Sequence, residues 1–321
     1  MFTAVAGGIL MVLICTLSIF LYIPVLYVFY RRPEFNSLVA YQLMFWTGIM
    51  DVGQLIVFDV SGVVATFQWN RFPSYVNKFL GSTLYALWFS MLFLSIFTTL
   101  NRFVSVVFRS HYNTLFDKNH VKIIYLLAFL IFLLPWLTKL TPYSSYCFSE
   151  WNLEWHYMPE DNHVLTRLSH YFGTYGILVF LVPSAITYTI IFIYIFSQKE
   201  RSMKRTEVIF TIQQLLVSLL YLFGFIYWST IDVWSTGTLI MNFFSNLTWI
   251  IMIALNPFIY LIVNRRLRRS VLVLLRCNSC AGRPTAAVIP MNAKTVMIAS
   301  NELRKGILAQ DTKKIYNKVL Y

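Results

Sequence analysis

Cysteine is scarce in this sequence, with only Cys15, Cys147, Cys277 and Cys280 among 321 residues. A small secreted fold held by disulfides needs a denser cysteine framework, so that class is excluded. Cys147 falls in a segment predicted below to lie outside the cell, where no second cysteine belongs, so we predict no structural disulfide. Cys277 and Cys280 form a CxxC pair that lacks the other two ligands of a zinc site. We therefore expect no metal and no cofactor.

Catalytic groups are equally sparse. The five histidines all fall in predicted loops or at the edges of apolar runs, and no HExxH motif or histidine box is present. An intramembrane aspartyl protease needs two carboxylates from different helices. Asp51 and Asp59 instead share one apolar run, about two helical turns apart and on different faces. The sequence therefore predicts a protein that is not an enzyme.

Charged residues are also few, at 12% of the chain, whereas 58% of the residues are hydrophobic. This balance excludes an ordinary soluble protein. The net charge of +13 would favour nucleic acid as the partner of a soluble protein. Here the basic residues lie in short loops between apolar runs and in one tail, where they orient a membrane protein and contact anionic headgroups. We expect membrane lipid, and no nucleic acid, as a partner.

The apolar residues form seven long runs. A hydrocarbon core about 30 Å thick requires about 20 residues of helix rising about 1.5 Å each. The predicted spans cover, approximately, residues 5–30, 38–66, 76–108, 121–140, 171–196, 208–228 and 238–263. The predicted fold is thus an all-α membrane protein, a seven-transmembrane helix bundle.

The basic residues are distributed unequally between the two sides of these spans. One side is predicted to hold only Arg71, Lys78, Lys139 and Arg167, and the other side holds all the rest. The positive-inside rule then predicts a multi-pass plasma-membrane protein with its amino terminus outside and its carboxyl terminus in the cytoplasm. The longest connection, residues 143–170, carries acids among tryptophans and tyrosines and is predicted to be a folded extracellular lid.

The segment after the last span is predicted to be a short cytoplasmic amphipathic helix over residues 264–276. One face is shared by Leu267, Val271, Leu274 and Leu275, while four arginines lie near the polar side, as in a helix on a membrane surface. The predicted seven-transmembrane receptor domain is residues 1–276, followed by a flexible cytoplasmic tail over residues 277–321. Cys277 and Cys280 are candidates for lipidation that would anchor this helix, and a pair of plain reduced cysteines is the alternative.

Polar residues inside the spans are the candidates for function, because an ionisable group at membrane depth is costly unless it is paired or hydrated. Asp51 is either a hydrated node that reports on helix rearrangement or a protonated acid bonded to a neighbour, with Asn256 as a possible partner. Asp59 either faces a ligand cavity or reaches the headgroups. Pro257, after Asn256 and one turn before Tyr260, predicts a hinge with a polar lever. Arg102 fits either a functional switch or an arginine that reaches the interface.

These residues resemble a known superfamily, the rhodopsin-like seven-helix G-protein-coupled receptors. The likeness covers about residues 5–276, and its matching residues are Asp51, Asn101-Arg102-Phe103, Pro183 and Asn256 to Tyr260 before the arginine-rich helix. Within that group the chain is most similar to the nematode serpentine chemoreceptors of classes T and X. The segments that carry this narrower match are Gly48-Ile49-Met50-Asp51, Thr98 to Phe103 and Asn256-Pro257.

The resemblance implies a receptor for a small external molecule that signals through a heterotrimeric G protein when the cytoplasmic ends of the third, fifth and sixth spans open around Arg102 and Tyr260. Asn101 replaces the usual acid, so Arg102 is expected to be held by Glu200 or Glu207, and basal activity is either raised or lost. Gly81 stands where a cysteine would tether the lid.

The ligand cavity that the resemblance implies is aromatic and weakly polar. Its expected lining is Tyr85, Trp88, Trp228 and Trp249, with interfacial aromatic belts as the alternative role of these residues. An amine ligand lacks its usual counter-ion, since the outer half of the third span has no aspartate. The alternative function is a membrane transporter or ligand-gated channel, but the inverted repeats or midplane polar stripe typical of that class are not found.

Overall fold

The computed structural model describes residues 3–69, 72–158, 164–197, 205–234 and 238–279. The chain divides into two units, Met1–Leu275 and Arg276–Tyr321. Of the predicted flexible tail, residues 277–321, all but the first three residues lie outside the described residues. All the long helices belong to the first unit.

Seven helices of the described chain are long and apolar enough to cross a membrane, which confirms the predicted bundle. These helices are α1 (Ala4–Arg31), α3 (Val39–Phe67), α4 (Ser74–Val106), α6 (Lys118–Leu140), α7 (Val164–Ser197), α8 (Arg205–Trp234) and α9 (Leu239–Val263). Shorter elements connect or follow them: α2 (Pro33–Asn36), η1 (Arg109–His111), α5 (Tyr112–Leu115) and α10 (Arg265–Ser279).

Helix boundaries follow local chemistry. The side chain of Thr3 accepts a hydrogen bond from the Ala6 N–H at the start of α1, and Asp117 accepts one from the His120 N–H at the start of α6. Gln68 ends α3 in the left-handed conformation, with φ of 47°. The prediction that α7 begins near residue 171 was wrong, because the helix already begins at Val164. A polar first turn is no obstacle to a helix that emerges into water.

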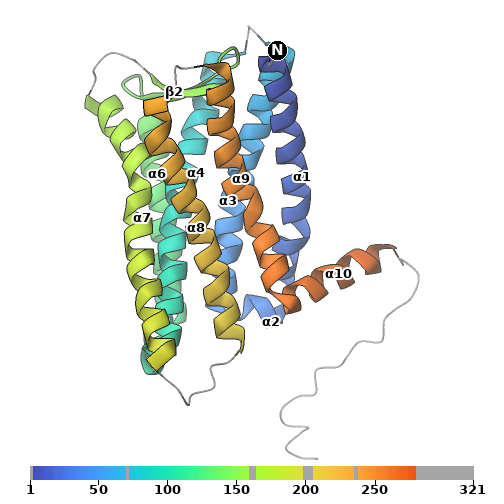
Figure 1. Ribbon diagram of the computed structural model, residues 1–321, viewed down its shortest axis with the longest axis vertical. Helices are drawn as coiled ribbons and strands as arrows, with labels where there is room; N and C mark the ends of the chain where they lie inside the picture. Colours follow the sequence, from blue (N-terminus) through green and yellow to red (C-terminus); the bar gives the residue numbers. More distant parts are fainter. Residues whose placement is uncertain (1–2, 70–71, 159–163, 198–204, 235–237, 280–321) are drawn as a thin grey trace, which may run out of the picture. The chain divides into compact units, whose positions relative to one another are not determined.

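The predicted lid contains a two-stranded antiparallel hairpin, β1 (Ser145–Ser149) and β2 (Glu154–Met158), in which Cys147 pairs with His156. The hairpin lies across the end of the bundle at which α1 begins (Figure 1). We call this the hairpin end. At the opposite end, which we call the α10 end, α2 lies close to the start of α10 (Figure 1). Over the residues that the structure describes, the fold is thus all-α except for this hairpin.

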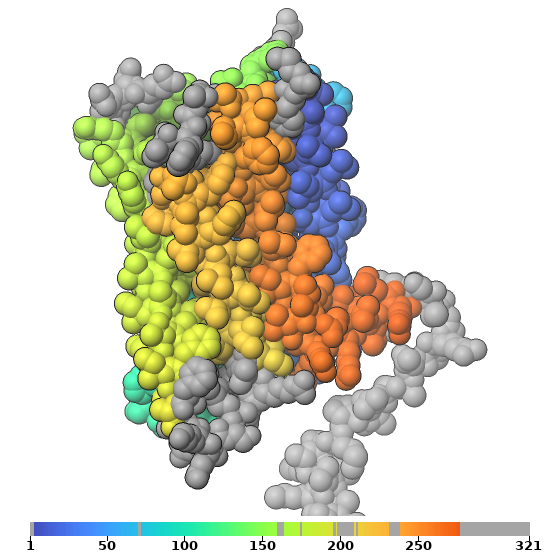
Figure 2. Space-filling view, in the orientation of Figure 1, coloured from blue at the N-terminus to red at the C-terminus, as the bar shows by residue number. Residues whose placement is uncertain are grey.

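Helix α4 lies at the centre of the bundle, packed against α3, α6, α7, α8 and β1. The outer faces of the bundle are apolar instead of polar, and large side chains such as Leu17 and Phe20 are about two-thirds exposed, at 68% and 67%. Figure 2 shows one such face, on which α7, α8, α9 and α1 follow one another. Broad apolar surfaces of this kind fit lipid as the surrounding solvent.

Candidate functional site

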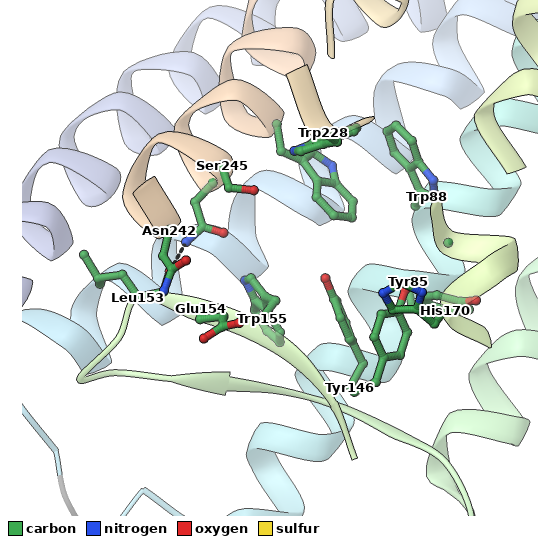
Figure 3. A pocket seen from close by; sticks show the side chains of 14 residues that line it. Tyr85, Trp88, Tyr146, Leu153, Glu154, Trp155, His170, Trp228, Asn242 and Ser245 are labelled. Carbon is green, nitrogen blue, oxygen red and sulfur yellow. Dashed lines mark hydrogen bonds between the residues drawn. The ribbon is translucent and has the colours of Figure 1, made fainter. Parts of the chain in front are cut away.

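A cavity of about 250 Å³ lies at the hairpin end, between the hairpin and helices α4, α7, α8 and α9. Figure 3 shows that residues of the hairpin face it from one side, and Trp88 and Trp228 from the other. Seven of the fourteen residues that line it are tyrosine or tryptophan, namely Tyr85, Trp88, Tyr146, Trp155, Tyr157, Trp228 and Trp249. A concave site that combines aromatic side chains with a few polar groups is the usual form of a small-molecule pocket.

Three tryptophans from different helices meet in the lining. The ring centroids of Trp88 and Trp249 are 4.9 Å apart, and those of Trp228 and Trp249 are 5.5 Å apart. The Trp249 indole N–H donates to Gln54 Oε1 on α3 at 3.0 Å. This bond fixes the ring that joins the cavity to the interior of the bundle.

Four of the five residues expected to face the cavity do so, namely Tyr85, Trp88, Trp228 and Trp249. Asp59 is not part of the lining. Its carboxylate accepts a hydrogen bond from Thr16 Oγ1 at 3.0 Å, between α3 and α1. The sequence places Asp59 near one end of a span. The sequence does not show which face of that helix packs against α1, so the contact between Asp59 and Thr16 could not be predicted.

The hairpin is held without a disulfide, since Cys147 is free. Gly81 of α4 lies so close to the hairpin that a Cβ atom added there would overlap the Tyr146 carbonyl oxygen. One turn earlier, Asn77 pairs with the backbone of Phe148, donating to its carbonyl at 2.8 Å and accepting from its N–H at 2.9 Å. Gly81, where a tethering cysteine was missing, is therefore a point at which α4 and the hairpin backbone approach each other closely.

Two further asparagines bind the turn of the hairpin from α9. Asn246 Nδ2 donates to the Leu153 carbonyl at 2.8 Å, and Asn242 Nδ2 donates to the Asn152 carbonyl at 3.1 Å. Both asparagines also line the cavity. The hairpin thus closes the cavity while it is bonded to α4 and α9.

Lys139, which the charge count assigned to the outer side of the membrane, is completely buried at 0% exposure. Its ammonium nitrogen lies 4.6 Å from the ring centroid of Tyr85, 4.4 Å from that of Tyr157 and 3.0 Å from Ser144 Oγ. Burial raises the pKa of the Tyr157 hydroxyl well above its usual range, so this residue offers a neutral ring. The amino group of Lys139 thus lies between two aromatic faces and a serine hydroxyl, and the described residues place no carboxylate in an ion pair with it.

A second polar cluster lies in the middle of the bundle, around Asp51. This residue is completely buried, and its Oδ2 accepts hydrogen bonds from Asn256 Nδ2 at 3.0 Å and from the Tyr22 hydroxyl at 2.7 Å. The bond expected between Asp51 and Asn256 is therefore present. Sequence reasoning missed Tyr22, because a tyrosine in an apolar run is typical of an interfacial belt. We call these three residues the polar node.

The polar node is only partly satisfied by the described residues. Asp51 Oδ1, Asn256 Oδ1 and the nearby Thr47 Oγ1 have no hydrogen-bond partner in the described part of the chain. Buried polar atoms usually have partners, and the exceptions often mark functional positions. The arrangement leaves two acceptor oxygens and one hydroxyl available for exchange of partners.

Asn101 and Arg102 are both buried near the end of α4. The Arg102 guanidinium donates to Asn101 Oδ1, and Asn101 Nδ2 donates to the Tyr112 hydroxyl of α5 at 3.1 Å. The neighbouring amide thus takes the position of the missing acid. Glu200, one of the two expected partners of Arg102, lies outside the described residues, and the side chain of Glu207 is not described.

Pro257 and Tyr260 are buried in α9 beyond the polar node. The Tyr260 ring centroid lies 6.3 Å from that of Phe29, within the core formed with α1 and α3. After α9, Asn264 begins α10: its Oδ1 accepts from the Leu267 N–H at 3.1 Å, and its Nδ2 donates to the Tyr41 hydroxyl at 2.8 Å.

The predicted amphipathic helix is present as α10. Leu267 and Val271 are buried, while Arg265 and Arg269 are exposed. The lipidation hypothesis stays a prediction, since the side chain of Cys277 is not described and Cys280 lies outside the described residues. Among the residues that the structure describes, no group of three or more histidines, cysteines or acids is placed to hold a metal ion.

The chain also matches the model of a known protein family. The family model for the serpentine type 7TM GPCR chemoreceptor Srt matches residues 2–283. No curated protein matches the chain.

Proposed function

Because the chain belongs to the Srt family of serpentine seven-transmembrane chemoreceptors, we propose that it detects a small external molecule in the aromatic cavity and transmits binding to a G protein at the α10 end. The family is one of multi-pass membrane receptors and not of enzymes. The family also implies a small-molecule ligand and a G protein as partners in general terms. This chain has to bind the ligand at the hairpin end and to transmit that binding to the α10 end.

One observation carries the proposal: α3 and α9 are bonded to each other at two levels. At the cavity, Trp249 of α9 donates to Gln54 of α3 at 3.0 Å. Deeper in the bundle, Asn256 of α9 donates to Asp51 of α3 at 3.0 Å. Gln54 and Asp51 are three residues apart, so they lie within one helical turn. A ligand that moves Trp249 acts on the same pair of helices that the polar node joins.

The switch we propose comprises Asp51, Asn256 and Pro257, with Arg102 and Tyr260 at the end of the pathway, together with Asn101. The bundle exchanges between two packings, and the node changes partners through its unsatisfied oxygens. Bundle ends near Arg102 then separate and admit the G protein. A ligand biases this equilibrium only by its difference in affinity for the two packings.

The proposed orientation has the hairpin end outside the plasma membrane and α10 in the cytoplasm. The α10 end carries a cluster of basic residues, among them Arg31, Arg32, Arg265 and Arg269, whereas the described part of the hairpin end carries Lys78, the buried Lys139 and Arg167. This asymmetry supports the orientation through the positive-inside rule. Antibody access to a tag before Thr3 in intact cells tests it.

The test of the receptor function measures recruitment of a G protein to the full chain in cells exposed to small volatile and soluble compounds. Three chains are compared: the parent, Arg102→Ala and Trp249→Phe. Recruitment should rise with an active compound and vanish in Arg102→Ala. Trp249→Phe keeps an aromatic ring but loses the donor to Gln54, so the maximal response should fall more than the ligand affinity does.

The competing outcome is an ionic current or solute flux from the same cells without recruitment under any condition. This result would favour the transporter or channel instead. An unchanged maximal response in Trp249→Phe, with recruitment otherwise intact, would separate the receptor function from the route through Gln54 and would refute only the route.

A further inference from the structure

We infer that the ligand of this cavity is a small organic cation, an amine whose charge is neutralised by Glu154 of β2 and whose substituents contact the tryptophan faces. This inference rests on the proposed function, because it names the ligand class of the same site. The sequence offered no counter-ion for an amine in α4. The structure brings a carboxylate to the cavity from the hairpin instead.

The charge of the cavity lining favours a cationic ligand. Glu154 is the only acid among the described residues that line the cavity, and no lysine or arginine is among them. The ion pairs in the described part of the chain join His120 to Asp117 and Arg266 to Glu34, so none of them neutralises Glu154. A ligand that covers this carboxylate removes it from water, which is costly unless the ligand supplies a positive charge or hydrogen-bond donors.

The side chain of Glu154 is exposed, so its charge meets both the surrounding water and the cavity that it lines. Burial, followed by the neighbouring Tyr85 and Glu154, raises the pKa of the Tyr146 hydroxyl above its usual range. Figure 3 shows Glu154 beside Trp155, on the side of the cavity where Asn242 lies. An anionic ligand would meet both this charge and the electron-rich faces of the rings, so it is disfavoured.

The aromatic side chains of the lining also favour a cationic ligand. A cation over the face of tryptophan or tyrosine is stabilised by the electron-rich ring, and tryptophan is the strongest of these partners. The cavity has four tryptophans, Trp88, Trp155, Trp228 and Trp249, and its volume of about 250 Å³ limits the ligand to a small molecule. Such a lining matches the size and charge of a simple primary or quaternary amine.

Lys139 determines which part of the cavity the amine uses. Its ammonium already lies against the rings of Tyr85 and Tyr157, at 4.6 and 4.4 Å from their centroids. A second cation beside those rings would be repelled. The ligand charge therefore belongs on the opposite side, near Glu154 and the asparagines of α9. The amide N–H groups of Asn242 and Asn246 donate to the hairpin backbone, and an ammonium can use their side-chain oxygens as acceptors.

The experiment measures binding to the purified full chain in lipid nanodiscs, with no G protein present. Each amine is compared with an uncharged molecule of the same shape: choline with 3,3-dimethylbutanol, and 2-phenylethylamine with 2-phenylethanol, with phenylacetate as the anionic probe. Dissociation constants are measured for the parent, Glu154→Gln, Glu154→Asp and Glu150→Gln. Glu150 lies in the hairpin turn and does not line the cavity, so it is the matched control.

At least one amine should bind about tenfold or more tightly than its uncharged counterpart, as expected for a charge-assisted contact. Glu154→Gln should abolish this preference, Glu154→Asp should retain part of it, and Glu150→Gln should leave it intact. The inference is overturned if the uncharged or anionic probes bind as tightly as the amines, if no amine binds, or if Glu154→Gln behaves like Glu150→Gln.

The two proposals fail in distinguishable ways. An amine that binds but recruits no G protein would contradict the receptor mechanism and leave the ligand class standing. Recruitment driven by uncharged compounds, unaffected by Glu154→Gln, would support the receptor and reject the cationic ligand.

Discussion

The hairpin end and the middle of the bundle use different hydrogen-bond partners. At the hairpin end, side chains of the helices bond to backbone groups, as Asn77 does to Phe148 and Asn246 does to Leu153. In the polar node, Asp51 and Asn256 bond through their side chains and keep unsatisfied oxygens. At the hairpin end one partner of each bond is a backbone group whose position the hairpin fixes, whereas in the bond between Asp51 and Asn256 both partners are side chains that can rotate. The comparison indicates a fixed lid above a core that can rearrange.

The largest effect is expected at Gly81. In Gly81→Ala the new Cβ would overlap the Tyr146 carbonyl oxygen, and that backbone is held in place by its neighbours in the hairpin. We expect a loss of about 3 kcal/mol in the free energy of unfolding, the upper range for overpacking. Alanine stabilises an ordinary helix by about 1 kcal/mol relative to glycine, so the sign of the change is itself informative. Thermal unfolding of the purified chain measures it.

Gly53→Ala is the matched control for this substitution. At Gly53 the atom nearest to a new Cβ is Leu87 Cδ1 at 2.8 Å, the end of a flexible side chain. Rotation of the Leu87 side chain should limit the change in the free energy of unfolding to about 1 kcal/mol. Equal effects at the two positions would contradict a rigid contact between α4 and the hairpin.

The next effect in size concerns Asn77. Asn77→Ala removes two hydrogen bonds and leaves the N–H and carbonyl of the buried Phe148 without this partner. We expect this substitution to lower the free energy of unfolding by about 2 kcal/mol. Asn242→Ala removes a single bond to the exposed Asn152 and should cost less than about 1 kcal/mol. Thermal unfolding of both variants without ligand measures the difference, and similar losses would show that the hairpin is not held mainly from α4.

The sequence allowed some features of the middle of the bundle and of the hairpin end to be predicted, and not others. The seven spans and the pair of Asp51 with Asn256 were predictable, because long apolar runs and polar residues within them are visible in one dimension. The aromatic lining was also found, since Trp88, Trp228 and Trp249 lie in the predicted outer halves of their spans. Tyr22 was not found, because its hydroxyl has a role only where α1 meets α3 and α9.

The fastening of the lid could not be predicted for a related reason. Gly81 and Asn77 act on the backbone of residues more than sixty positions later, and no local pattern records what approaches a helix. Lys139 was assigned to the outer side by its charge, yet aromatic rings and a serine enclose it completely. The charge count is insensitive to burial, which depends on how α6 meets the hairpin.

A smaller effect on stability is expected in the polar node. In Asp51→Asn the new side chain keeps an acceptor for Tyr22, and Asn256 can turn its unpartnered oxygen toward the new amide. The free energy of unfolding should change by less than about 1 kcal/mol, while G-protein recruitment changes clearly. Asp51→Leu offers no acceptor and should cost about 2 kcal/mol. Large destabilisation by Asp51→Asn would mean that the node is as fixed as the lid.

The smallest effect is expected at the α10 end, where Glu34 of α2 pairs with Arg266 of α10. The ion pair is close, with Nη2 and Oε2 2.6 Å apart, but the side chains are 37% and 57% exposed. Water screens such a pair, so a double-mutant cycle with Glu34→Gln and Arg266→Gln should give a coupling energy of about 0.5 kcal/mol that decreases further in high salt. Asn264, which joins Leu267 to Tyr41, is expected to hold α10 more firmly than this pair. A coupling energy well above about 1 kcal/mol would instead make the α10 end a third kind of region, held by charge.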